Sequence, residues 1–294
     1  MILFRLFLVL DSFLMALPRS WRKSFFIFLS TLAYTFDRKR KKIIQQNLMF
    51  AFENSLDPQE YETISRYCYR NLALNFLQVM ENRRNSSADL RAKVHFKNPE
   101  IVEKLLREDR GIIFLSAHYG NWEIGAAALA DLMTPIHSIY RTLNNKAFAP
   151  YLLEARARHR MHMTEKSGAL KHLTRTLKNR QAVSLLIDQA SNARSGVKIN
   201  FFGHPTYQTS TPAILSYKYN APIVALYIQS DDEEHYTITF EEPIEVEGDD
   251  EASILKATQR QADQLEKVIR ADPKFWFWCH KRWKGEYKEI YSAR

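Results

Sequence analysis

The sequence of 294 residues is poor in cysteine and glycine. Its two cysteines, Cys68 and Cys279, are far apart in the chain and have no CxxC or Cys/His ligand spacing, which argues against a zinc site or a disulfide framework and predicts reduced thiols. The 8 glycines and 10 prolines leave little material for long linkers or a glycine-marked propeller. Without repeats or low-complexity tracts, the chain is expected to form one large domain or two.

Basic residues outnumber acidic ones, with 42 Lys and Arg against 33 Asp and Glu and a formal net charge of +9. This surplus predicts an anionic partner, which could be nucleic acid, an acidic membrane surface or an acidic substrate. With 46% hydrophobic and 26% charged residues, the chain can build a sizeable core, so disorder is excluded.

Two apolar runs open the chain. Residues 1–17 are almost wholly apolar but contain Arg5 and Asp11, and a second run covers Ser24 to Phe36. Both are shorter than the roughly 20 residues that a spanning helix needs. Eight basic residues and one acidic residue lie between Arg19 and Lys42, a cluster that would stay on the cytoplasmic side and attract anionic headgroups.

This start of the chain has three interpretations: a cleavable signal peptide, a buried core helix or a membrane anchor. A signal peptide would need an uninterrupted apolar centre followed by a small-residue cleavage site, and neither is clear here. Basic clusters on both sides of the second run favour an anchor at residues 1–42. It could be one tilted span or a pair of helices lying in the interface.

The rest of the chain alternates between helical and strand patterns. Continuous apolar runs at 111–117 and 182–188 predict strands buried on both faces. The alternation predicts an α/β domain over residues 99–294, with a mainly parallel sheet covered by helices on both faces, after a helical, membrane-proximal segment at 43–98. Further strands are predicted at 136–140, 222–228 and 235–240, and helices at 101–106, 122–132, 146–161, 170–179, 212–219 and 251–270.

Within the segment 43–98, residues 58–80 have the three- and four-residue spacing of an amphipathic helix. The apolar face predicted for this helix consists of Ile64, Cys68, Leu72, Phe76, Val79 and Met80.

Ligands of such sheets bind outside the carboxyl ends of the strands, and two predicted strands end in reactive side chains. His118 follows the first, Asn121 is placed as a helix N-cap and Glu123 stands in the first helical turn. Across a tight turn, this separation would let Glu123 fold back and set the tautomer and basicity of the imidazole. The pattern is short, and a histidine that merely caps a turn would also satisfy it.

No Gly-x-Ser-x-Gly elbow or suitably placed cysteine accompanies His118, so a substrate hydroxyl would be the nucleophile. Such chemistry needs positive charge or amide donors where an oxygen becomes anionic. The open helix N-terminus after Asn121 and the guanidinium of Arg141 are the candidates. Asp188, which ends the second strand, is expected to line the site, although an ordinary N-cap or loop acid would also fit its position.

The segment GIIFLSAHYGNWEIGAAAL at 111–129 resembles the signature region of the bacterial lipid A biosynthesis acyltransferases, the lauroyl and myristoyl transferases, whose pattern is His, four residues, then Asp or Glu. The likeness covers nearly the whole chain, including the apolar start. The other matching blocks follow in the same order and are IYRTLNN at 139–145, the basic stretch 156–160, LLIDQ at 185–189, NFFGHPTYQTSTPA at 200–213 and DPKFWFWCHKRWK at 272–284.

The resemblance implies that His118 is a general base for a hydroxyl of an acceptor glycolipid, which attacks an acyl thioester, and that Glu123 orients the imidazole. It also implies acyl carrier protein as co-substrate, a Kdo-bearing lipid A precursor as the anionic acceptor, and a place on the cytoplasmic face of the inner membrane. No cofactor, metal or nucleic acid is expected. The predicted substrate-binding residues are Arg141, Asn144, Arg156, Asp188 and Gln189.

Two other functions stay open from the residues alone. One is an acyl-coenzyme A-dependent acyltransferase of another glycolipid, such as a mannosylated phosphoinositide. The other is a non-catalytic membrane-surface or nucleic-acid-binding protein, because the aromatic and basic residues at 274–284 could stack single-stranded nucleic acid, although they equally suit a headgroup interface. Phe201, Phe202, Gly203, Cys279 and His280 are expected to be structural.

Overall fold

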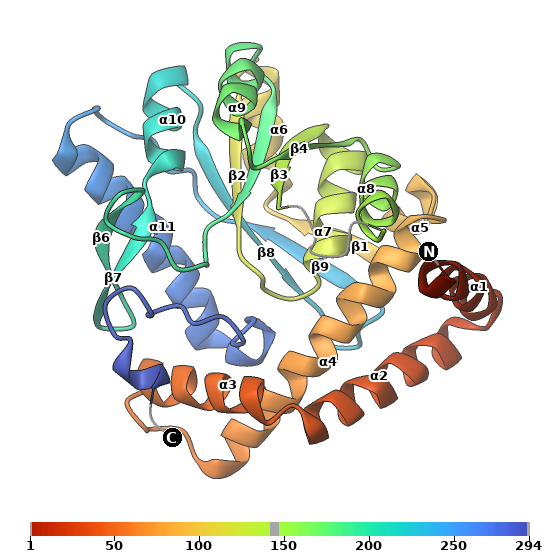
Figure 1. Cartoon of the computed structure of the whole chain (residues 1–294). Coiled ribbons are helices and arrows are strands. Elements are labelled where there is room, and N and C mark those ends of the chain that lie inside the picture. Colours follow the sequence, from red (N-terminus) through yellow and green to blue (C-terminus); the bar gives the residue numbers. More distant parts are fainter. Residues whose placement is uncertain (1, 142–146, 293–294) are drawn as a thin grey trace.

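The computed structural model describes residues 2–141 and 147–292 (Figure 1). Its main sheet has the strand order β1-β9-β8-β2-β5-β3-β4, and β6 pairs with β7 in a separate antiparallel hairpin. The strands are β1 Val94–Lys97, β2 Ile112–Ser116, β3 Ile136–Tyr140, β4 Met161–Glu165, β5 Ala182–Leu186, β6 Gly196–Phe201, β7 His204–Thr209, β8 Ile223–Gln229 and β9 Tyr236–Phe240.

Five neighbouring strands, β8, β2, β5, β3 and β4, run parallel to one another. Strand β9 is antiparallel to β8 because a short connection joins them, and β1 is parallel to β9. The predicted α/β fold with a mostly parallel sheet is therefore confirmed. The α-helices around it are α1 Ile2–Ala16, α2 Arg19–Phe36, α3 Arg38–Ala51, α4 Pro58–Asn82, α5 Ser87–Lys93, α6 Pro99–Arg107, α7 Trp122–Ala128, α8 Ala149–Ala157, α9 Ala169–Lys178, α10 Thr211–Tyr219 and α11 Glu251–Ala271.

Helices cover both faces of this sheet, as strand β2 shows. All of its residues are buried, and side chains alternate between faces along a strand. Ile113 and Leu115 pack with residues of α3, α9, α10 and α11, whereas Ile112 and Phe114 pack with residues of α5, α6 and α7. Strand β2 is thus central to both cores, which fixes the position of the loop that follows it.

The two apolar runs at the start of the chain form helices α1 and α2, which pack with α4 and α8 in a third hydrophobic cluster. The side chain of Asp11 is buried, forms ion pairs with Arg83 and Arg84, and accepts a hydrogen bond of 2.8 Å from the hydroxyl of Tyr151. Among the helices of the described residues, none combines the length and the apolar character required to traverse a bilayer.

The structure corrects the sequence prediction in three places. The helix predicted at 146–161 is shorter, and the chain enters strand β4 at Met161. The loop predicted after Asp188 contains the β6–β7 hairpin, and β1 adds Val94–Lys97, within the segment predicted to be helical, to the sheet. The missed strands are short and carry polar or charged residues, most of them at exposed positions, so their hydrophobic signal is weak. The three-part division of the chain remains a prediction.

Helix α4 was predicted correctly, but its buried face is different. Leu72 and Phe76 are 37% and 42% exposed. Helix α4 lies between α2 and α7 (Figure 1). One of its buried sides is polar and donates hydrogen bonds to the carbonyl of Gly120 in the loop after β2 and to that of Glu123 in α7. That side consists of Asn71, Asn75, Gln78 and Asn82.

Both cysteines are free thiols, as predicted. Their sulfur atoms nevertheless lie 3.7 Å apart, because α4 and the C-terminal segment pack together. The spacing of the two residues in the sequence does not reveal this contact.

Candidate active site

The register between β2 and β5 brings His118 and Asp188 together. Ser116 is opposite Leu186 in this parallel pair, and the backbone N–H of Ile187 donates a hydrogen bond of 3.2 Å to the carbonyl of Ser116. His118 and Asp188 each stand two positions beyond the paired residues, at the carboxyl edge of the sheet. Adjacent parallel strands thus deliver an imidazole and a carboxylate to the same place.

Asp188 holds the imidazole through its carboxylate. One oxygen lies 2.9 Å from Nδ1 of His118, and the other accepts hydrogen bonds from the backbone N–H of His118 at 3.0 Å and from Nε1 of Trp276 at 3.1 Å. The Asp188 side chain is fully buried, whereas that of His118 is 17% exposed. A carboxylate only accepts, so Nδ1 carries a proton. Within residues 2–141 and 147–292, Nε2 has no hydrogen-bond partner.

The electrostatics of this pair favour a protonatable imidazole. Burial by itself lowers the pKa of His118, but the charge and hydrogen bond of Asp188, with a further contribution from the charge of Glu123, raise that pKa above its ordinary value. Burial by itself would raise the pKa of Asp188, yet the adjacent imidazole holds it well below its usual range. The pair can therefore take up a proton on Nε2 while Asp188 stays ionised.

The structure places Glu123 differently from the prediction. Its buried carboxylate is paired with Arg156 of α8, with oxygens 2.7 Å from Nη2 and 3.3 Å from Nε. The carboxylate bonded to the imidazole is that of Asp188, so the predicted fold-back of Glu123 onto His118 is wrong in its geometry. Glu123 and Arg156 affect His118 through their charges.

The turn between β2 and α7 is fixed by close packing. Gly120 has a φ of +61°, and a Cβ there would lie 1.8 Å from the carbonyl oxygen of Ile228, so only glycine fits. The side-chain amides of Asn71 and Asn75 donate hydrogen bonds of 2.9 and 3.1 Å to the Gly120 carbonyl. Asn121 accepts from the N–H of Ile124 and is the N-cap of α7, as predicted.

Aromatic rings form the wall around His118. Its ring centroid lies 5.1 Å from that of Trp122, 6.2 Å from Phe277 and 5.2 Å from His280. The backbone N–H of Phe277 donates a hydrogen bond of 2.9 Å to the His118 carbonyl, which ties the C-terminal segment to the site. The sequence indicated an aromatic, basic segment there but did not indicate that it reaches His118.

The remaining predicted residues lie at the margin of the site or beyond it. Gln189 is exposed, and its Nε2 is 3.4 Å from Nε2 of His280. Arg141 is exposed and directly follows β3, at the same carboxyl edge of the sheet. Asn144 lies outside the described residues. Among the described residues, no set of three or more His, Cys, Asp or Glu side chains could hold a metal ion.

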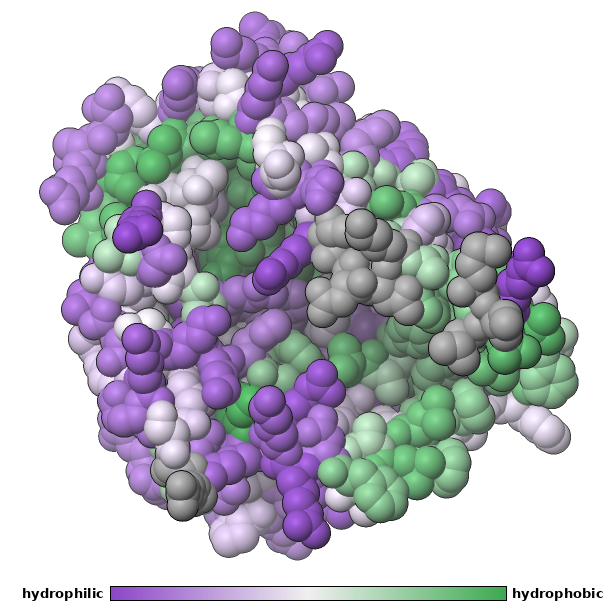
Figure 2. Space-filling view, viewed as in Figure 1, coloured by the Kyte–Doolittle hydropathy of each residue, from purple (hydrophilic) through white to green (hydrophobic). Residues whose placement is uncertain are grey.

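The surface around the site is hollowed. Figure 2 shows a hollow near the middle of the face viewed, between hydrophilic residues and the hydrophobic residues of α1 and α2. The loop after β2 runs through the same part of the view (Figure 1). The side chain of His118 keeps 17% of its surface exposed.

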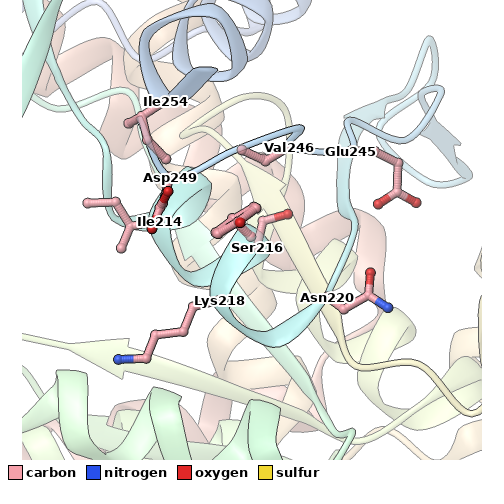
Figure 3. Close-up of a pocket in the computed structure, with 9 residues that line it drawn as sticks. Ile214, Ser216, Lys218, Asn220, Glu245, Val246, Asp249 and Ile254 are labelled. Carbon is pink, nitrogen blue, oxygen red and sulfur yellow. The ribbon is translucent and has the colours of Figure 1, made fainter. Parts of the chain in front are cut away.

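A separate pocket of about 720 Å³ lies near the amino ends of the strands, opposite to the carboxyl ends where His118 lies (Figure 3). It is lined by residues of α10, such as Lys218, and by Glu245 and Asp249 from the segment before α11. Asn220 at its rim stands just before β8 begins, whereas His118 follows the end of β2, which is parallel to β8. The pocket is thus at the amino ends of the strands, away from His118.

The fold and the site define an α/β protein with an acid–base pair, a partly exposed His118 and a buried Asp188, at the carboxyl edge of a parallel sheet. The model of the bacterial lipid A biosynthesis acyltransferase family matches residues 2–285, nearly the whole chain. The protein belongs to this family, as the ordered sequence blocks indicated. No curated protein matches the chain. Family membership supports an acyltransferase activity that uses an acyl donor and a lipid acceptor.

Proposed function

We propose that this protein transfers a fatty acyl chain from acyl carrier protein to a hydroxyl of a Kdo-bearing lipid A precursor. The observation that carries the proposal is the His118–Asp188 pair, in which Nδ1 is held and Nε2 is left for substrate. The net charge of +9 suits both an acidic carrier and an acceptor with phosphates and carboxylates.

The chemistry follows from the free ring nitrogen. His118 Nε2 removes the proton of the acceptor hydroxyl while the oxygen attacks the thioester carbonyl carbon. The carbon–sulfur bond then breaks, and the leaving sulfur takes the proton from Nε2. Asp188 stabilises the imidazolium formed between these steps, as a carboxylate does in the hydrolase triads. The products are an ester and a free thiol.

Two arginines near the site are suited to an anionic acceptor. Glu123 holds the Arg156 guanidinium, whose side chain remains 19% exposed, and Arg141 follows β3 at the site edge of the sheet. Guanidinium groups bind phosphate and carboxylate in a bidentate manner. We assign acceptor binding to these residues, with Gln189 at the rim.

Helices α1 and α2 carry a surface suited to the cytoplasmic face of the inner membrane. We call it the apolar helix surface (Figure 2). Large exposed apolar patches mark protein or membrane contacts, and the basic residues at 38–42 would meet anionic headgroups. We propose that these helices lie in the interface. The surface consists of Leu6, Val9, Leu10, Phe13, Trp21, Phe28, Leu29, Leu32 and Phe36.

The apolar helix surface is also placed to deliver a lipid to the site. Arg19 and Lys23 of α2 donate hydrogen bonds of 3.2 and 2.7 Å to the carbonyls of Glu233 and Asp232. That loop follows β8, whose carboxyl end shares an edge with that of β2. A lipid in the bilayer could therefore keep its chains in the membrane while its sugar reaches His118.

The test is acyl transfer by purified protein to a Kdo-bearing lipid A precursor, followed by mass spectrometry of the lipid. His118→Ala is expected to remove transfer while the thermal unfolding midpoint and vesicle binding stay close to those of the unchanged protein. Transfer by this variant at the full rate would exclude the proposed base. Matched reactions with acyl carrier protein and with coenzyme A as donor decide between carrier-dependent and coenzyme-dependent transfer.

A further inference from the structure

Several backbone N–H groups near His118 already have acceptors within the protein and are not available to a substrate. The thioester oxygen becomes anionic when the hydroxyl attacks and needs a hydrogen-bond donor. The N–H groups of Glu123 and Ile124 donate to the side chains of Asn75 and Asn121, so the start of α7 is less open than the sequence indicated. The N–H groups of His118 and Gly120 are also occupied, by Asp188 and the Phe275 carbonyl.

We propose that His280 supplies this donor, as a second catalytic imidazole that stays neutral and donates its ring N–H to the thioester oxygen. The inference rests on the proposed acyl transfer. The ring of His280 lies 5.2 Å from that of His118 at 65°, and 4.9 Å from that of Phe277 at 83°. Both imidazoles therefore border the same space, and His280 is half-buried.

The backbone that carries His280 is held firmly. The Nδ2 group of Asn47 in α3 donates to the carbonyls of Trp278 at 2.6 Å and His280 at 2.7 Å. The N–H of Arg282 also donates to the His280 carbonyl, at 2.9 Å, and the Arg282 side chain is fully buried. A donor must be prearranged to stabilise a transition state, because reorganisation during the reaction costs free energy.

The contact with Gln189 indicates which nitrogen of His280 carries the proton. The Nε2 atoms of the two side chains lie 3.4 Å apart. An amide N–H only donates, so Nε2 of His280 accepts and its ring proton is on Nδ1. Within the described part of the chain, Nδ1 has no hydrogen-bond partner. His280 thus has an N–H available to a substrate.

The environments of the two imidazoles suit different roles. Burial, followed by the charges of His118 and Lys284, lowers the pKa of His280, and only the charge of Asp188 opposes this. The pKa of His118 is raised. When His118 takes the proton, His280 therefore remains neutral. Opposite shifts of two neighbouring groups are a sign of divided acid–base roles.

The experiment compares His280→Asn with His280→Leu, because Asn and Leu have nearly the same shape and only Asn has an N–H donor. We expect the Leu variant to lose about 10²-fold in kcat, as when an oxyanion donor is removed, with KM for both substrates unchanged. The Asn variant should retain at least about a tenth of the original kcat. His204→Phe is the control, since His204 is another half-buried histidine among aromatic rings, away from His118.

Equal kcat values for the Asn and Leu variants would overturn the inference, as would a Leu variant that matches the unchanged protein. If the Leu variant does not fold, a loss of more than about 10²-fold in a folded Asn variant has the same meaning, because that variant keeps its donor. A protein that transfers no acyl chain before any substitution would instead refute the proposed function. The two failures are therefore distinguishable.

Discussion

The substitution Asp188→Asn tests the site most directly, because it preserves shape and removes only the charge and one acceptor. Asp188 is fully buried and contacts the ring of His118, its backbone N–H and Trp276. A hydrogen bond to a charged group contributes about 1.5–3 kcal/mol, and about 1.4 kcal/mol corresponds to tenfold in rate. We expect kcat to fall by about 10- to 10²-fold, and further if the amide selects the wrong tautomer.

The pH profile of the same variant separates catalysis from folding. The base acts when neutral, and Asp188 raises the pKa of His118 above its ordinary value of 6.5, so the acid limb of kcat/KM is expected above pH 6.5 in the unchanged protein. In Asp188→Asn only burial and the weaker charges remain, and the limb should move to lower pH. An unchanged limb together with an unchanged kcat would refute the assignment of Asp188.

Linkage gives the corresponding effect on stability. The folded-state pKa of Asp188 is lowered, so its stabilising effect is present above the unfolded value of about 3.9 and is lost as the pH falls. The folded-state pKa of His118 is raised, so its effect is present below about 6.5 and is lost as the pH rises. The difference in unfolding free energy between the two proteins should therefore be largest between these values, which denaturant titrations measure.

Three further predictions concern the membrane surface and the scaffold. Leu6→Glu should weaken binding to anionic vesicles in a flotation assay by at least about tenfold, because a buried Leu contributes about 1.5–3 kcal/mol. The control variant Leu170→Glu should bind normally, although Leu170 is 62% exposed and Leu6 60%. Equal binding by the two variants would exclude the apolar helix surface as the membrane contact. Gly120→Ala should lower the free energy of unfolding by at least about 2 kcal/mol, because the left-handed backbone and the clash of the new Cβ with the Ile228 carbonyl each cost about 1–3 kcal/mol. An unchanged midpoint of thermal unfolding would contradict this packing. Asp11→Ala removes the buried carboxylate that accepts from Arg83, Arg84 and the Tyr151 hydroxyl, and should cost about 1.5–3 kcal/mol, the contribution of hydrogen bonds to a charged group. Hydrogen exchange should then increase in α1, and unchanged protection would count against the docking of α1.

The sequence predicts the central strands well because their signal is local. Strand β2 is buried on both faces, so its run from Ile112 to Ser116 is wholly apolar apart from its last residue, and no other structure suits such a short run between a glycine and a turn. Strands β1 and β4 lie at the edges of the sheet, where one side of each strand is unpaired. Their apolar and polar residues largely alternate, but over only four or five residues, so the pattern is too short to distinguish a strand from a loop. Edge position explains why these strands escaped prediction.

The contacts of the amino-terminal helices are a second feature that the sequence does not predict. An acid in an apolar run indicates a weak membrane span, but it does not indicate what the acid contacts. The partners of Asp11 are Arg83, Arg84 and Tyr151, which are remote in sequence and meet it only because α1 crosses the end of α4 and α8. Asn71 is another example: it is buried because it bonds to the Gly120 carbonyl, which is remote in sequence, but its polar side chain led to the prediction that it lies outside the buried face of α4. Such contacts depend on tertiary packing alone.

The pairing of His118 with Asp188 was partly predictable, because the sequence placed both residues after strands of one mainly parallel sheet but did not give the order of those strands. Both residues follow strands predicted to belong to one mainly parallel sheet; the structure shows that these strands are neighbours and that each residue stands two positions past the last paired residue. Residues at equal distances beyond adjacent parallel strands arrive side by side at the carboxyl edge. Glu123 instead lies in the first turn of α7, which begins at Trp122. Its side-chain direction is therefore set by the helix, and its carboxylate pairs with Arg156 of α8 rather than with His118. Strand register is therefore a better guide to the partner of a strand-end histidine than proximity in the sequence.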